Sequence, residues 1–113
     1  MCKSKIHRAT VKESDLNYEG SLSIDETLMN EAGILPFEMV QVANVTNGHR
    51  FETYAIVAPP NSGQICLNGA AARLGAIGDE IIIMTYALYK EEELKNFKQN
   101  VILVDKQNAI IKK

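Results

Sequence analysis

The sequence has little of several residue types that mark other classes of protein. Its 113 residues include two cysteines, Cys2 and Cys66, two histidines, His7 and His49, and no tryptophan. Two cysteines are too few for a disulfide framework, and no CxxC or Cys/His cluster indicates a metal, so we expect no metal site. Cys66 lies in an apolar segment, and we expect it to be a small buried side chain.

Long apolar runs and a strong net charge are also lacking. No run reaches membrane-spanning length and no signal-peptide layout is present, so we expect a cytoplasmic protein without a membrane partner. The net charge of −2 gives no general attraction to nucleic acid, and we expect no nucleic-acid partner. Without a dinucleotide or phosphate loop, any chemistry must come from side chains or from a group that the chain makes itself.

The chain is rich in short alternating segments. Residues 5–11 predict a strand with Ile6, Arg8 and Thr10 on one face and Ala9 and Val11 on the other. We expect a polar turn at 12–15, an extended stretch at 16–24 that Gly20 interrupts, and further strands at 39–45, 50–58, 64–67, 81–87, 101–104 and 109–111. The apolar run 81–87 predicts a strand buried on both faces.

Helix and turn signals are few but specific. Asp25 is a predicted N-cap for a short helix over 26–32, and Gly33 is a predicted left-handed residue after it. Asn47 and Gly48 predict a type I′ hairpin turn, and helical turns are expected at 68–75 and 90–95. One domain, 1–113, of mainly β class follows: a compact β-barrel-like fold with short helices.

One dipeptide organises the functional interpretation. Gly20-Ser21 alone is most often just a turn, but here it accompanies other short motifs in a fixed order: Lys5, His7 and Arg8, then 44–48, 50–55 and 68–72. Together these residues resemble the pyruvoyl-dependent aspartate 1-decarboxylases, small enzymes that make β-alanine. The resemblance runs from Lys5 to about Asp105.

The resemblance implies a fold, an activity and a way of making the cofactor. The fold is a small double-psi β-barrel. The chain is made as a proenzyme that cleaves itself between Gly20 and Ser21, giving chains 1–20 and 21–113, and Ser21 becomes a covalent pyruvoyl group. L-aspartate is then converted to β-alanine and CO₂ for pantothenate and coenzyme A synthesis. Homotetramers with active sites between subunits are implied, and the need for a maturation factor is left open.

The residues at the dipeptide suit this chemistry. Loss of CO₂ leaves a carbanion that needs an electron sink, and a carbonyl that forms a Schiff base with the substrate amine provides one. The hydroxyl of Ser21 can attack the preceding peptide carbonyl to give an ester, which β-elimination and hydrolysis convert to a pyruvoyl group. Gly20 lacks a Cβ, which permits a strained approach. The oxyanion needs a donor, and the resemblance assigns this role to Thr53.

Substrate contacts are likewise implied by the resemblance. Arg50 and Lys5 are the cations for the two carboxylates of aspartate, and Tyr54, with an ordinary pKa of about 10, is the proton donor. Small residues form the rest of the substrate-binding loop and others support the site: Gly69, Ala70 and Ala71 with Thr53, then His7, Tyr18 and Asn68. Many family members have a bulky aromatic residue where this chain has Ala43.

Other interpretations remain open at this point. Taken alone, Arg50 is also a solvated hairpin residue, Lys5 a surface lysine, Tyr54 a barrel-wall aromatic and His7 a structural histidine. A non-catalytic small β-barrel that acts as a binding or regulatory module is the alternative from another class, although the scattered basic residues argue against a DNA-binding one. A pyruvoyl decarboxylase for a different acidic amino acid is a third reading.

Overall fold

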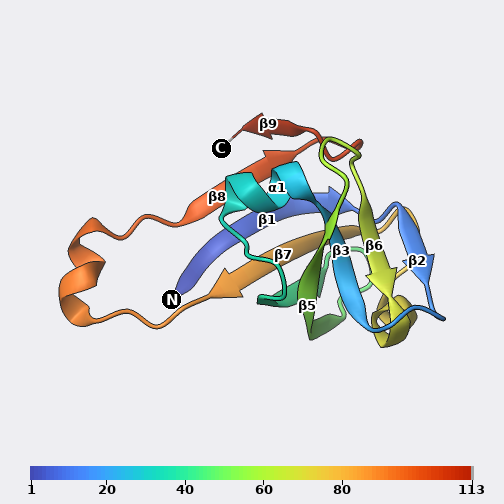
Figure 1. Ribbon diagram of the computed structural model, residues 1–113, viewed down its shortest axis with the longest axis horizontal. Coiled ribbons are helices and arrows are strands. Elements are labelled where there is room, and N and C mark those ends of the chain that lie inside the picture. The colour runs from blue at the N-terminus through green and yellow to red at the C-terminus, as the bar shows by residue number, and fades with distance from the viewer. Residues whose placement is uncertain (113) are drawn as a thin grey trace.

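The computed structural model describes residues 1–112, and it is mainly β with short helices, as expected (Figure 1). The strands are β1 (Cys2–Thr10), β2 (Glu13–Asp15), β3 (Ser21–Asp25), β4 (Met39–Asn44), β5 (Arg50–Ala58), β6 (Ile65–Asn68), β7 (Glu80–Tyr86), β8 (Asn100–Val104) and β9 (Ile110–Lys112). The helices are α1 (Glu26–Ala32) and two 3₁₀ segments, η1 (Gly69–Leu74) and η2 (Glu91–Asn96).

The strands form one sheet that the chain itself closes. Its order is β2-β6-β3-β5-β4-β7-β1-β8-β9. Only Val11 and Lys12 separate β1 from β2, although β1 pairs with β7 and β2 pairs with β6. The backbone N–H of Lys12 donates to the Ile65 carbonyl at 2.9 Å and continues the pairing with β6. The sheet therefore closes into the small barrel that was predicted.

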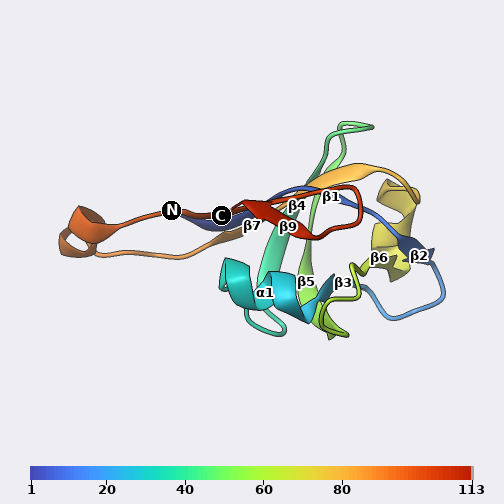
Figure 2. The ribbon, with the colours of Figure 1, turned by 90° about the horizontal axis from the view of Figure 1, so that it is seen from above.

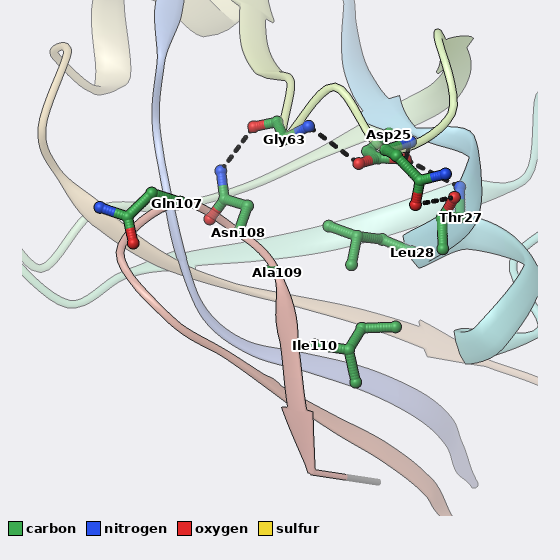
Figure 3. Close-up of a pocket in the computed structure, with 9 residues that line it drawn as sticks. Asp25, Thr27, Leu28, Gly63, Gln107, Asn108, Ala109 and Ile110 are labelled. Carbon is green, nitrogen blue, oxygen red and sulfur yellow. Dashed lines mark hydrogen bonds between the residues drawn. The ribbon is translucent and has the colours of Figure 1, made fainter.

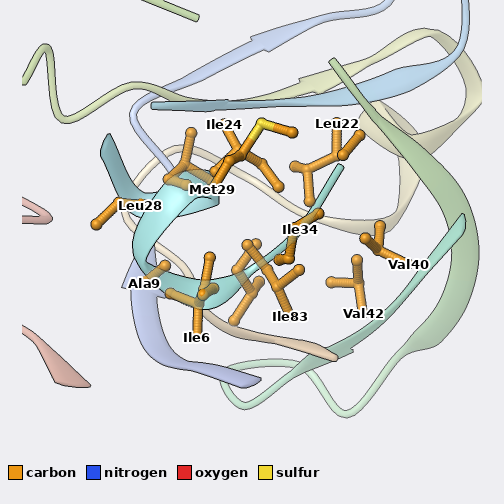
Figure 4. Close-up of a cluster of buried hydrophobic side chains, with 14 of the residues drawn as sticks. Ile6, Ala9, Leu22, Ile24, Leu28, Met29, Ile34, Val40, Val42 and Ile83 are labelled. Atoms are coloured by element: carbon orange, nitrogen blue, oxygen red, sulfur yellow. The ribbon is translucent and has the colours of Figure 1, made fainter. Parts of the chain in front are cut away.

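Apolar side chains from β1 and from β3 to β8 fill the interior of the barrel (Figure 4). Ile6, Ile83 and Val42 form one row across β1, β7 and β4, and all three are fully buried. Helix α1 covers this core with one apolar face: Leu28, Met29 and Ala32. Burial of each such large side chain contributes about 1.5–3 kcal/mol to folding.

The predicted helix is confirmed with both of its caps. It spans Glu26–Ala32, the Asp25 carboxylate accepts from the N–H of Thr27 at 2.8 Å, and Gly33 has a left-handed φ of 73°. The same carboxylate accepts from the backbone N–H groups of Asn61 and Gly63, both at 2.9 Å. Asp25 therefore ties the loop before β6 to the start of α1.

The alternation predicted for β1 is wrong beyond Ile6. A bulge lies between Ile6 and Ala9, where Arg8 adopts a φ of 61°. The bulge shifts the side-chain alternation, so that Ala9 and Val11 join Ile6 in the core instead of facing away from it. The predicted turn at 12–15 is also wrong, because Glu13–Asp15 forms β2 against β6.

Two further expectations are corrected. The turn at Asn47-Gly48 is not type I′, because only Gly48 has a positive φ, of 82°. A longer loop joins β4 to β5, and the Asn44 side chain organises it by accepting from the N–H groups of Thr46 and Asn47. Strand β7 is fully buried on one face only, since its residues alternate between buried and half-buried.

A long arm leaves the barrel after β7 and returns as β8 (Figures 1 and 2). It carries η2, and an edge-to-face contact between Tyr89 and Phe97, with ring centroids 5.1 Å apart, joins its two limbs. Leu88 on this arm is fully exposed. Within residues 1–112, no helix combines the length and apolar character needed to cross a membrane.

Candidate active site

Ser21 begins β3 and points away from the barrel core. Leu22 and Ile24 face the core, so Ser21 and Ser23 project from the other face of the strand. On the antiparallel neighbour β6, Asn68 lies opposite Ser21 and Cys66 lies opposite Ser23. We call these four side chains, Ser21, Ser23, Cys66 and Asn68, the Ser21 cluster.

Hydrogen bonds connect all four members of the Ser21 cluster. The Asn68 amide nitrogen donates to Ser21 Oγ at 3.0 Å and to Ser23 Oγ at 2.9 Å. The Cys66 thiol donates to Asn68 Oδ1 at 3.0 Å. Ser21 is only 1% exposed and Asn68 only 3%, so both are shielded from water although they lie outside the core. The Ser21 hydroxyl oxygen is therefore held in one place by a buried amide.

Cys66 is neutral in this setting. Burial raises the pKa of its thiol above the ordinary 9.0, and the carboxylates of Glu13 and Asp15 on β2 raise it further, while a backbone hydrogen bond with Asp15 lowers it. A protonated thiol is a hydrogen-bond donor, whereas a thiolate is not. The expected burial of Cys66 is confirmed.

Gly69 packs against the backbone of Gly20 more closely than any other residue type could. Its φ is 63°, and a Cβ built on it would lie 2.7 Å from Gly20 Cα and 2.8 Å from the Tyr18 carbonyl oxygen. A Cβ on Gly20 would instead meet nothing within 4 Å, and Gly20 has no left-handed φ. The steric requirement for glycine that was predicted at Gly20 thus falls on Gly69.

Thr53 and Tyr54 lie on the other neighbour of β3. In the parallel pair of β3 and β5, Leu22 lies opposite Ala55, so Ser21 and Tyr54 are the residues immediately before this pair. Tyr54 is 38% exposed on the outside of the barrel, while Thr53 is half-buried on the inner side. Ala70 and Ala71 follow Gly69 at the start of η1. The structure thus gathers most of the predicted site residues around Ser21.

Lys5 and Arg50 are not gathered there. Lys5 of β1, Met84 of β7 and Gln41 of β4 occupy one row on the outside of the barrel. Arg50 lies on the same side and donates to Gln41 Oε1 at 3.4 Å. It is four residues before Tyr54 on β5, a separation of about 13 Å. We call this surface the outer face: Lys5, Met39, Gln41, Arg50, Tyr54, Met84 and Tyr86.

His7 is also separate from Ser21, on β1 beside the bulge. Its Nδ1 atom is buried and has no hydrogen-bond partner among the described residues. Burial lowers the pKa of the imidazole below the ordinary 6.5, and Lys5 and Arg8 lower it further, while Glu80 raises it. His7 is therefore neutral at pH 7.

The space beside the Ser21 cluster carries the wrong charge for an acidic ligand. A pocket of about 310 Å³ there is lined by Tyr18, Ser23, Cys66 and Asn68 together with the carboxylates of Glu13 and Asp15. Within the described chain, no lysine or arginine lines it. A dicarboxylate bound there would need cations from elsewhere.

A second pocket, of about 240 Å³, is structural (Figure 3). It lies between the start of α1 and the turn before β9. The Asn108 amide donates to the carbonyl oxygens of Gly63 and Thr10, both at 2.8 Å, and Asp25 is occupied by the N–H groups already described. Asn108 and Asp25 therefore both bond backbone groups, and Asn108 holds the turn before β9 in place.

The site contains residues that sequence reasoning missed. Ser23, Cys66 and Gln41 were not predicted to contact the site residues. The available signal was the two-residue spacing of Ser21 with Ser23 and of Cys66 with Asn68, which places each pair on one face of its strand. No group of three or more His, Cys, Asp or Glu side chains in the described part of the chain is arranged to hold a metal.

Comparison with known proteins identifies the family. The family model described as aspartate decarboxylase matches residues 1–111. The chain is 57% identical over 113 residues to the aspartate 1-decarboxylase of Lactiplantibacillus plantarum, covering 100% of this chain and 87% of that protein. It is 61% identical over 108 residues to that of Syntrophobacter fumaroxidans (96% and 87% covered) and 58% identical over 108 residues to that of Thermoanaerobacter pseudethanolicus (96% and 92% covered). This chain belongs to the aspartate decarboxylase family.

Proposed function

We propose that this chain is a pyruvoyl-dependent aspartate 1-decarboxylase, which converts L-aspartate to β-alanine and CO₂ for pantothenate and coenzyme A synthesis. Full-length similarity to proteins of that name supports the activity. We place the enzyme in the cytoplasm, where this biosynthesis takes place.

The proposal includes self-cleavage of the single domain 1–113 between Gly20 and Ser21, giving chains 1–20 and 21–113. The observation that carries it is the placement of Ser21 Oγ, buried and held by Asn68 directly beside the bond to be cut. Ser21 accepts from Asn68, so its own hydrogen is not committed to that contact. Thr53, one residue before Tyr54 on β5, is the proposed donor to the oxyanion.

The surroundings of Ser21 suit a small carbonyl group at this position. The packing of Gly69 against Gly20 leaves no room for a side chain on Gly69, and Asn68 presents an amide N–H to the Ser21 side chain. A pyruvoyl group formed here supplies the electron sink that decarboxylation requires. Gly69, Ala70 and Ala71 bring backbone close to the substrate, and the Tyr54 hydroxyl delivers the proton to the carbon that loses CO₂.

We further propose that the active site is shared between subunits of a homotetramer. The Ser21 cluster lies beside two carboxylates, whereas the cations Lys5 and Arg50 lie on the outer face. That face also exposes large apolar side chains, including Met39 and Tyr86, which a second copy would cover. The outer face of one subunit then brings its two cations to the Ser21 cluster of the next.

Mixed assemblies test this sharing. Ser21→Ala and Arg50→Ala chains are each expected to be inactive alone. Co-expressed, they should regain part of the activity, because Ser21 of one chain meets Arg50 of the other. A mixed tetramer, verified by native mass spectrometry, that stays inactive would contradict the shared site.

The proposed function itself is tested by a denaturing intact-mass spectrum of the purified protein. Two fragments split after Gly20 are expected, the larger lighter by one ammonia than simple hydrolysis predicts. A full-length mass that warming or a maturation factor converts would still support the proposal. A full-length mass that nothing converts would favour the non-catalytic barrel. Substrate screening of the cleaved protein separates L-aspartate from other acidic amino acids.

A further inference from the structure

Cys66 donates to the amide that holds Ser21, and neither family resemblance nor the proposed function gives it a role. Its thiol contacts Asn68 Oδ1 at 3.0 Å, and its alternative acceptor, the Leu67 carbonyl, is farther away at 3.9 Å. Cys66 is 4% exposed and its acceptor residue Asn68 is 3% exposed, so both partners of this hydrogen bond are shielded from water.

We propose that Cys66 is a positioning residue for self-cleavage: its thiol fixes the Asn68 amide so that an N–H donor faces Ser21 Oγ. The inference rests on the proposed cleavage between Gly20 and Ser21. A side-chain amide has a donor end and an acceptor end of nearly equal shape, so its partners decide which way it points. A thiol donor at Oδ1 leaves both N–H groups for Ser21 and Ser23.

The orientation matters because of what happens to Ser21 Oγ. In the first step Oγ attacks the Gly20 carbonyl carbon, the carbon–nitrogen bond breaks, and the hydroxyl proton goes to the nitrogen, which becomes a free amine. In the resulting ester, Oγ carries no hydrogen and can only accept. Only an amide that presents its nitrogen to Oγ can hydrogen-bond the ester oxygen. An amide turned the other way would place Asn68 Oδ1 against Ser21 Oγ, and two acceptors repel each other.

The second step increases the demand on the same hydrogen bond. The α-proton of residue 21 leaves, the bond from Cβ to Oγ breaks, and its electron pair stays on Oγ, which departs in the Gly20 carboxylate. The dehydroalanine left at residue 21 takes up water and loses ammonia, which gives the pyruvoyl group. Negative charge develops on Oγ during elimination, so a hydrogen bond from Asn68 is stronger in the transition state than before it.

A purely structural role for Cys66 makes the opposite prediction for conservative variants. Cysteine in an apolar segment is often just a small buried side chain. If packing alone mattered, Cys66→Ala would perform at least as well as Cys66→Ser, because a buried hydroxyl costs more than a methyl group. If donation matters, serine should rescue the function and alanine should not.

The experiment follows the cleavage of freshly purified proenzyme by intact mass. We expect Cys66→Ser to cleave at close to the wild-type rate and Cys66→Ala to cleave about tenfold more slowly, the effect of one lost hydrogen bond. Cys66→Val, which keeps the apolar volume without a donor, should be as slow as Cys66→Ala and guards against a folding defect. Cys2→Ala is the matched control on the other cysteine and should match wild type.

Cleavage of Cys66→Ala or Cys66→Val at the rate of Cys66→Ser would overturn the inference. Failure of the wild-type chain to cleave under any condition would instead remove the proposed function. The two failures are therefore distinguishable, and neither readout depends on decarboxylation activity.

Discussion

The Ser21 cluster and the outer face differ in how complete they are within one chain. In the cluster, three buried side chains and the half-buried Ser23 hydrogen-bond one another over 2.9–3.0 Å. On the outer face, the hydrogen bond from Arg50 to Gln41 is long, at 3.4 Å, and Met39 and Tyr86 are exposed. A single chain thus fixes the groups proposed for cleavage but leaves those proposed for the substrate unfinished.

The difference separates two requirements of the proposed enzyme. Cleavage needs only atoms that one folded chain already holds together, so it should proceed before assembly. Decarboxylation needs the cations of the outer face, where Arg50 lies about 13 Å along β5 from Tyr54, so it should depend on a second copy. Substitutions in the two regions should therefore affect cleavage and turnover differently.

The largest effect is expected for Ser21→Ala, which removes the hydroxyl of the Ser21 cluster and leaves the outer face unchanged. Without the nucleophile, the chain should remain folded, uncut and inactive. Intact mass, circular dichroism and a β-alanine assay measure the three properties. Ser23→Ala is the matched control on the same face of β3, and it should still cleave. Detectable turnover by Ser21→Ala would refute the assignment.

Tyr54→Phe should distinguish most clearly between the requirements for cleavage and those for turnover. Cleavage is expected to continue, because the phenol takes no part in it, whereas kcat should fall by about 10²–10⁴-fold through loss of the proton donor. Intact mass and steady-state kinetics on the fully cleaved protein provide the comparison. Unchanged turnover would assign the proton donor to another residue.

Gly69→Ala should slow cleavage about tenfold, because it disturbs the Gly20 backbone beside the Ser21 cluster. The new Cβ would collide with the Gly20 backbone, and the left-handed φ itself costs about 1–2 kcal/mol. Gly48→Ala is the control, because Gly48 has a similar φ of 82° but no neighbour within 4 Å of a built Cβ. If both variants cleave at the same rate, the close contact is irrelevant and only backbone strain matters.

The smallest effect concerns pH and His7. The folded chain lowers the pKa of this imidazole below 6.5, so the unfolded chain binds the proton more readily. This contribution to the free energy of unfolding is fully present above pH 6.5 and is lost as the pH falls below it. Chemical denaturation should be measured between about pH 5 and 8, which spans the ordinary histidine pKa. As the pH falls, the free energy of unfolding should decrease less for His7→Gln than for wild type. Identical profiles for wild type and His7→Gln would disprove the effect.

The parts of the fold that sequence predicted well are those controlled by local signals. Asp25 and Gly33 bound α1 because a cap and a left-handed residue act within one helical turn. The bulge at Arg8 could not be predicted, because it arises where β1 pairs with β7, about seventy residues away in the chain (Ile6 opposite Ile83, then Ala9 opposite Ile81). Pairing with β6 likewise turns Glu13–Asp15 into a strand.

The candidate site was predictable as a set of residues but not as an arrangement. The ordered motifs point to Ser21, Asn68 and Tyr54, and the structure places them on the adjacent strands β3, β6 and β5. The contact from Cys66 to Asn68 depends on which side chains share the outside of β6, which no motif encodes. The separation of Arg50 from Ser21 follows from β5, because Arg50 begins this strand whereas Tyr54, four residues later, is the residue beside Ser21.

The position of β1 in the sheet has a consequence for refolding. It lies between β7 and β8, and β2 continues from it to pair with β6, so residues 1–20 supply a central strand rather than an edge. Before cleavage this strand is tethered to the rest of the barrel, and folding of the barrel is a first-order process. After the proposed cleavage the same strand would be a separate molecule, and recovery from denaturant would become second order. Dilution should then slow refolding of the cleaved protein while leaving that of the Ser21→Ala proenzyme unchanged, until subunits begin to assemble.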